Sequence, residues 1–139
     1  MAVLLVDVAN VVGSRPDGWW RDRAGASARL LDRLARLPGS VVEGPDGAPL
    51  AATAVVAVVE GEAREVAEPP GLRLVRAAGS GDDALAGYAE ELAAGDDGGA
   101  LLVVTADRGL RARLPTGTAV AGPGWLLRVL DGLDASPSA

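Results

Sequence analysis

Three short runs of the sequence are apolar without interruption, and they constrain the fold more than any other feature. They lie at residues 3–6, 54–59 and 101–104. A strand with one wet face alternates apolar and polar residues, whereas a strand covered on both faces is apolar throughout. The three runs therefore predict the buried strands of a parallel sheet with helices on both sides. Weaker apolar segments at 72–75 and 118–121 predict strands at the edges.

The segments between these runs have helical patterns. Residues 24–37 form an amphipathic pattern in which Leu30, Leu34 and Leu37 share one face. Further helices are expected at 82–94 and 125–130. Strands that alternate with helices predict an α/β fold, here a three-layer α/β/α arrangement around a mostly parallel five-stranded sheet.

The connections are uneven in length. The Gly/Pro-rich stretch 38–49 is a long connection with a small hairpin expected around 45–47, and the link 61–71 has room for one helical turn at most. With 139 residues the chain suits a single domain. We expect that domain to span 1–130 and to be followed by a flexible C-terminal tail at 131–139.

The residue types that the chain lacks limit the reactions that it could catalyse. The chain has no Cys, no His and no Lys. This excludes thiol and Ser-His nucleophiles, imidazole bases, zinc-thiolate sites, Schiff bases and a phosphate-binding Walker lysine. Carboxylates, arginines and hydroxyls remain, so an enzyme of this composition is expected to use metal-bound carboxylates.

The net charge of −6 argues against a protein that coats nucleic acid through bulk positive charge. It is compatible with contact to a few phosphates at an acidic metal site. The apolar N-terminal stretch is interrupted by Asp7 and lacks a basic leader, so it does not resemble a signal peptide. No apolar run is long enough to span a membrane, and a cytoplasmic protein without membrane partners is expected.

Polar side chains follow the ends of three predicted strands. Asp7 follows the strand at 3–6, and Asn10 comes three residues later. Asp82 and Asp83 open the helix after the strand at 72–75, and Asp107 follows the strand at 101–104. In open parallel sheets ligands bind beyond the carboxyl ends of the strands. These side chains are therefore candidates for one shared site.

Each carboxylate also has a structural explanation. Asp82 and Asp83 could favour the positive end of a helix dipole, Asp107 could cap the turn at 108–113, and Asp7 could hold the loop after it. Asp7 is the strongest functional candidate, because a charge that continues a central buried strand is costly unless it is paired or bound to metal.

Three segments together resemble a known family. They are LVDVANV at 5–11, GDD at 81–83 and VTADR at 104–108. In order and spacing, over about residues 2–122, they resemble the NYN branch of the PIN-like nucleases. The resemblance implies strand order 3-2-1-4-5 and cleavage of RNA with one or two Mg²⁺ or Mn²⁺ ions.

The resemblance also assigns roles to single residues. It implies that Asp7, Asp82, Asp83 and Asp107 are metal ligands, and that Asn10 orients Asp7 or a water molecule. Carboxylate oxygens suit these hard cations. A divalent ion provides both a water-derived nucleophile and charge neutralisation for phosphodiester hydrolysis.

The chain departs from the family pattern at Arg111, where many members have an acidic residue. One-metal catalysis, weakened activity and a phosphate clamp made by Arg111 itself are therefore all open. Arg108 and Arg21 follow strand ends as well and are candidates for phosphate contact, because guanidinium binds phosphate through two hydrogen bonds.

Trp19 and Trp20 are adjacent in the loop after the first strand, in a chain with only four aromatic residues. One of them could stack on a nucleobase. The alternative is that the pair packs on the first helix or on a second copy of the chain in a homodimer.

Three functions fit these observations. The leading hypothesis is a PIN-like ribonuclease that cleaves single-stranded RNA. A second enzyme hypothesis keeps the metal site but hydrolyses small nucleotides, as a nucleoside triphosphate pyrophosphohydrolase does. The third is a binding or regulatory module in which the change at Arg111 has silenced catalysis.

Overall fold

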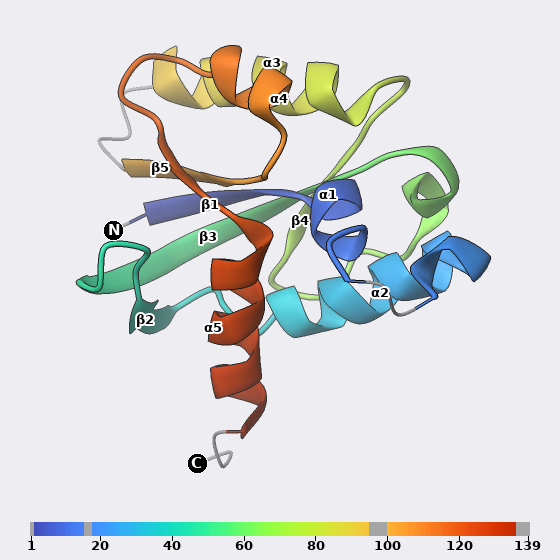
Figure 1. Cartoon of the computed structure of the whole chain (residues 1–139), viewed down its shortest axis with the longest axis horizontal. Helices are drawn as coiled ribbons and strands as arrows, with labels where there is room; N and C mark the ends of the chain where they lie inside the picture. Colours follow the sequence, from blue (N-terminus) through green and yellow to red (C-terminus); the bar gives the residue numbers. More distant parts are fainter. Residues whose placement is uncertain (1, 16–17, 95–99, 136–139) are drawn as a thin grey trace.

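The computed structural model describes residues 2–15, 18–94 and 100–135. Its centre is three parallel strands, β3 (Pro49–Val59), β1 (Ala2–Asp7) and β5 (Ala100–Val104), in that spatial order (Figure 1). Edge strands β4 (Arg73–Arg76) and β6 (Ala119–Ala121) pair in parallel with β3 and β5. The five parallel strands thus follow the expected order 3-2-1-4-5.

A sixth strand makes the sheet differ from the prediction. Strand β2 (Ser40–Glu43) runs antiparallel to the first residues of β3, and a tight turn at 44–48 joins the two. The small hairpin expected around 45–47 is therefore present. It extends the sheet because β3, with 11 residues, is long enough to pair with β2 at one end and with β4 at the other.

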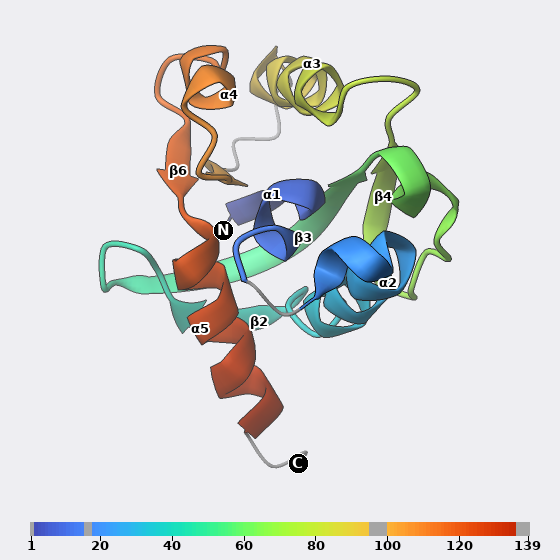
Figure 2. The same ribbon diagram turned by 45° about the vertical axis from the view of Figure 1, so that its right-hand side comes forward.

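Helices cover both faces of the sheet. On one face lie α1 (Val8–Val12), α2 (Arg23–Leu34) and α5 (Pro123–Ala135), and on the other lie α3 (Gly81–Ala94) and α4 (Arg108–Ala112) (Figure 2). Successive residues of β1 serve opposite faces: Leu4 packs on the first face and Leu5 on the second. The three-layer α/β/α prediction is confirmed, and it explains why the runs at 3–6, 54–59 and 101–104 are apolar at every position.

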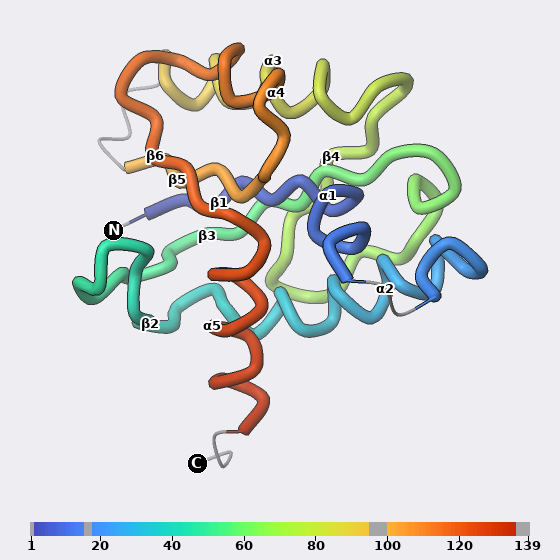
Figure 3. The backbone as a smooth tube through the Cα atoms, in the orientation of Figure 1, coloured from blue at the N-terminus to red at the C-terminus, as the bar shows by residue number. Residues whose placement is uncertain are grey.

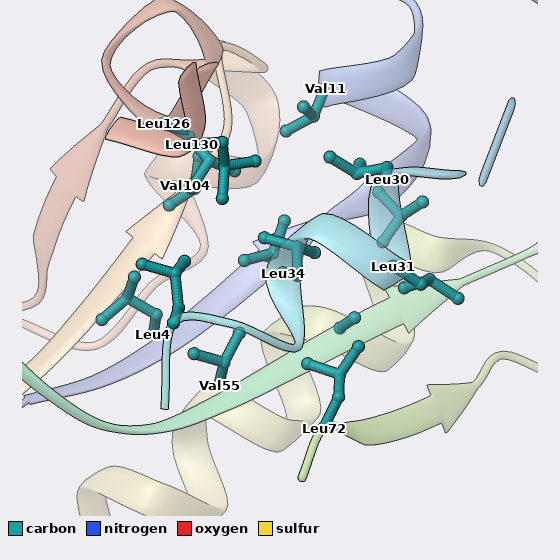
Figure 4. Close-up of a cluster of buried hydrophobic side chains, with 14 of the residues drawn as sticks. Leu4, Val11, Leu30, Leu31, Leu34, Val55, Leu72, Val104, Leu126 and Leu130 are labelled. Atoms are coloured by element: carbon teal, nitrogen blue, oxygen red, sulfur yellow. The ribbon is translucent and has the colours of Figure 1, made fainter. Parts of the chain in front are cut away.

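The larger core lies between α2, α5 and the sheet. Leu30, Leu31 and Leu34 of α2 pack over the sheet, beside Leu126 and Leu130 of α5 (Figure 4). The predicted leucine face of the first long helix is therefore buried. The helix ends at Leu34, three residues earlier than expected, although the side chain of Leu37 is still fully buried.

Two short 3₁₀ turns complete the order of elements. η1 (Trp19–Arg21) precedes α2, and η2 (Gly61–Glu65) is the only helical turn between β3 and β4. The latter agrees with the prediction that the link 61–71 holds one turn. Figure 3 shows β5 beside β1, although the two strands are far apart in sequence.

The C-terminal segment differs from the prediction. Helix α5 continues to Ala135, so residues 131–135 are not the frayed tail that we expected, while 136–139 lie outside the described residues. Arg33 of α2 explains the difference, because its guanidinium binds Asp131 and Asp134 of α5 at 2.7 Å each. Arg36 adds a contact to Asp134 at 3.0 Å. In the described part of the chain no helix has the length and apolar character needed to cross a membrane.

Candidate functional site: an acidic cleft at the strand ends

The carboxyl ends of the central strands open onto one polar cleft of about 310 Å³. Strand β1 ends at Asp7, β3 is followed directly by Glu60, and β5 leads through Thr105 to Asp107. The cleft is lined by side chains from all three strand ends and from the start of α3: Asp7, Ala9, Asn10, Glu60, Ser80, Asp82 and Asp107. Four carboxylates thus share a small volume.

Asp7 is the most buried of these carboxylates, with 6% of its surface exposed. One carboxylate oxygen accepts a hydrogen bond from the Thr105 hydroxyl at 3.0 Å, and the other accepts from the backbone N–H of Asn10 at 3.4 Å. The side chain therefore caps α1 and also ties β1 to β5. Burial raises the pKa of Asp7 to about 6, and the charges of Asp82 and Glu60 act in the same direction.

Asn10 holds the neighbouring loop. Its side-chain carbonyl accepts the backbone N–H of Ala106 at 2.8 Å, so its position is set by the chain between Thr105 and Asp107. The sequence resemblance implied that this side chain orients Asp7 or a water molecule. The contact with Asp7 is made by the backbone N–H of Asn10, and the amide side chain positions the loop that carries Asp107.

Asp107 and Asp82 start the helices of the second face. Asp107 is the N-cap of α4, where it accepts the backbone N–H of Leu110 at 3.0 Å, as its structural explanation predicted. It lines the cleft as well, so the two roles coincide. Burial raises the pKa of Asp82, and the charges of Asp107 and Glu60 raise it further.

Sequence reasoning missed Glu60. One of its carboxylate oxygens accepts the backbone N–H of Gly81, which ties the end of β3 to the start of α3. A signal for it was present, since Glu60 follows its strand as directly as Asp7 ends β1. Thr105 and Ser80 were missed as site residues too. The Thr105 hydroxyl orients Asp7, and Ser80 accepts the backbone N–H of Asp82 at 3.2 Å.

Asp83 is the predicted ligand that the structure does not bring to the cleft. Its side chain is 73% exposed and pairs with Arg113 at 2.8 Å. The reason is helical geometry, because successive residues of a helix point about 100° apart and Asp82 takes the direction of the cleft. The acidic pair at 82–83 thus separates into one cleft residue and one surface ion pair.

Arg111 neither lines the cleft nor points away from the fold. Its guanidinium donates to the backbone carbonyl of Thr105 from Nε at 3.2 Å and from Nη2 at 2.8 Å. It therefore braces the residue whose hydroxyl binds Asp7. Arg108 and Arg21 are exposed, and neither guanidinium forms a hydrogen bond or ion pair with another described residue.

The two adjacent tryptophans have different environments. Trp19 is half-buried and has the guanidinium of Arg23 above its ring, 5.3 Å from the centroid. Trp20 is 52% exposed and meets Trp19 edge-to-face, with the ring centroids 6.0 Å apart. The pair thus packs at the start of α2, and the Trp20 ring is open to solvent.

The donor chemistry of the cleft fits a hard divalent cation. Burial is the main cause of the raised pKa values of Asp7 and Asp82, and the neighbouring carboxylates of the cleft raise both pKa values further. Across residues 2–15, 18–94 and 100–135, no three acidic side chains are arranged closely enough to hold an ion by themselves. Mg²⁺ commonly binds through only one or two carboxylates and keeps several water ligands, so such a cluster is not required.

Comparisons with known proteins place the fold. No protein-family model and no curated protein sequence matches this chain. Among solved structures it is similar to Rae1 (YacP) from Bacillus subtilis, with a TM-score of 0.70 and 16% identity over 96% of this chain and 76% of that one. The W164L mutant of the same protein gives a TM-score of 0.66 and 19% identity over 96% and 77% of the two chains. At these identities the likeness shows a shared fold alone, the three-layer α/β/α arrangement described above.

Proposed function

We propose that this protein is a metal-dependent phosphodiester hydrolase, a PIN-like ribonuclease that cleaves single-stranded RNA. One observation carries the proposal: three central strand ends and the start of α3 direct Asp7, Glu60, Asp82 and Asp107 into one cleft. The absence of Cys, His and Lys leaves carboxylate-held metal as the main route to a nucleophile at neutral pH.

Asp7, Asp82 and Asp107 are the carboxylates that would hold the ion, with one or two of them bound directly and water completing its coordination, while Glu60 is engaged with Gly81. A bound Mg²⁺ or Mn²⁺ supplies a water-derived nucleophile and a Lewis acid for the phosphate. Asp83 is not included, because it faces away from the cleft in a pair with Arg113.

The surrounding residues position these ligands. Thr105 fixes the rotamer of Asp7 through its hydroxyl, and Arg111 fixes the backbone of Thr105. Asn10 fixes the loop that carries Asp107. The hydrogen bonds from Arg111 to Thr105 give this arginine a role that requires neither a second metal nor direct contact with phosphate. Arg108 is exposed next to Asp107 and is the arginine best placed to meet a phosphate entering the cleft.

A cleavage assay tests the proposal. A labelled single-stranded RNA and a panel of nucleoside triphosphates are incubated with Mn²⁺, with Mg²⁺ or with EDTA. We expect divalent-dependent cleavage of the RNA and its loss in Asp7→Asn, because an amide is isosteric with a carboxylate but a poorer ligand for a hard cation. Hydrolysis of nucleotides alone would establish the pyrophosphohydrolase alternative.

The silent-module alternative is separated by calorimetry. The open spacing of the carboxylates favours it, since no three of them in the described chain are preassembled. A protein that neither cleaves RNA nor binds Mn²⁺ would be such a module and would refute the proposed function.

A further inference from the structure

A second hollow adjoins the acidic cleft. It measures about 440 Å³ and lies between the end of α1, the turns η1 and η2, and the first half of α2. Ala9 and Glu60 line both spaces, so the two lie next to each other. A volume in the range of roughly 300–1,000 Å³ is typical of small-molecule sites.

The walls of this hollow combine aromatic surface with hydrogen-bonding groups. Trp19 and Arg23 form one wall, with the guanidinium held over the indole ring. Glu62 contributes a second carboxylate beside that of Glu60. Planar ligands stack on indole and guanidinium surfaces, and carboxylates accept hydrogen bonds from amino groups.

Ser27 is the strongest single indication of a ligand. It lines the hollow, only 3% of the residue is exposed, and its hydroxyl forms no hydrogen bond with any described residue. Fully enclosed polar side-chain atoms in the described chain all have partners, so this hydroxyl must reach the open space of the hollow. A buried polar group without a partner is costly unless a ligand or water binds it.

The geometry points to a nucleobase-binding subsite, in which the base next to the phosphate held at the acidic cleft enters this hollow. Phosphate is a poor occupant, because the hollow has two carboxylates against one arginine. A base is uncharged and planar, and it offers ring nitrogens to the Ser27 hydroxyl. Exocyclic amino groups can bind Glu62, so adenine, guanine and cytosine should be preferred over uracil.

This inference rests on the proposed function for the link to a phosphodiester, but base binding can be measured without it. The probes are adenosine, guanosine, cytidine and uridine, which carry no phosphate and need no metal. Each is titrated against the full chain in EDTA and followed by ligand-observed NMR. We expect the three amino-bearing nucleosides to bind more tightly than uridine.

Two variants localise the binding. Trp19→Leu removes the stacking surface and should weaken nucleoside binding about tenfold, within the range known for base–aromatic stacking. Ser27→Val removes the hydroxyl and fills part of the hollow, with a comparable loss expected. Ala28→Val adds volume at the next position of the same helix, outside the hollow, and should bind nucleosides as the unchanged chain does. Thermal unfolding of each variant checks that it is folded.

The outcomes are distinct. The subsite would be overturned if no nucleoside binds, or if binding survives both Trp19→Leu and Ser27→Val. It would also be overturned if binding is lost only in Trp20→Leu. Uridine binding as tightly as the others would overturn the role of Glu62. If the nucleosides bind as expected while RNA is not cleaved, the subsite stands and the proposed nuclease activity fails.

Discussion

Replacing Asp7 by Asn should stabilise the protein at neutral pH and destabilise it in acid. Asp7 is buried at the end of the central strand, and its pKa is about 6 instead of the usual 3.8. At about 1.36 kcal/mol per pKa unit, the shift corresponds to a cost of about 3 kcal/mol when the carboxyl is ionised. Asparagine keeps the size of the side chain and removes the charge.

The substitution also weakens two hydrogen bonds. Ionised or not, the carboxyl accepts from the Thr105 hydroxyl and from the N–H of Asn10, whereas an amide has a single acceptor oxygen. We assign this loss a cost of about 1–2 kcal/mol. The net expectation at pH 8 is a gain of about 1–2 kcal/mol, which for a chain of this size is a rise in Tm of roughly 5 °C.

The sign of the stability change in Asp7→Asn depends on pH, because the free-energy cost of burying Asp7 arises only when its carboxyl is ionised. In the folded state Asp7 binds its proton more tightly than in the unfolded state, so its contribution to stability falls as pH rises from about 4 to about 6. Below pH 4 the carboxyl is neutral in the folded protein and only the lost hydrogen bonds remain. Asp7→Asn should then be the less stable protein.

Thermal unfolding followed by circular dichroism between pH 4 and pH 8, in EDTA, measures the difference directly. Asp32→Asn, at an exposed position of α2, gives the baseline for the same chemical change. We expect the Tm difference between Asp7→Asn and the unchanged chain to reverse sign across this range. A difference of constant sign and size would refute the conclusion that Asp7 is a buried, destabilising charge.

Three further predictions follow from the site and the helix contacts. Millimolar Mn²⁺ should raise the Tm of the unchanged chain by mass action and should do so much less in Asp82→Asn; an equal shift in both would place the ion elsewhere. Arg111→Ala should lower the Tm by a few degrees and reduce RNA cleavage, because the backbone carbonyl of Thr105 loses its hydrogen bonds to the guanidinium. Arg111→Lys should recover part of both the Tm and the cleavage. An unchanged Tm in Arg111→Ala would contradict this role. Arg33→Ala should lower the Tm by a few degrees at low salt and by less in 1 M NaCl, measured by the same unfolding assay, because it breaks the contacts between α2 and α5; a salt-independent loss would indicate packing instead of charge.

Local sequence was enough for the central architecture. The uninterrupted apolar runs are strands buried on both faces, and a segment of that kind has few alternatives in a chain with helices between the runs. The same patterns indicated Asp7 and Asp107, because each lies at or just beyond the end of such a strand. The small hairpin around 45–47 was also predictable from its Pro-Asp-Gly sequence. In the structure Gly47 adopts the left-handed conformation that glycine favours.

Tertiary structure decided which of the candidate side chains meet. Asp82 and Asp83 are equivalent in the sequence, and the direction of α3 relative to the sheet turns one into the cleft and the other to Arg113. Residues 131–135 lack a strong local helix signal and are helical because α2 presents arginines to their carboxylates. Arg111 binds a carbonyl that no sequence spacing identifies. Strand identity follows from periodicity along the chain, whereas these contacts depend on the angles at which distant segments pack, and a linear pattern does not contain those angles.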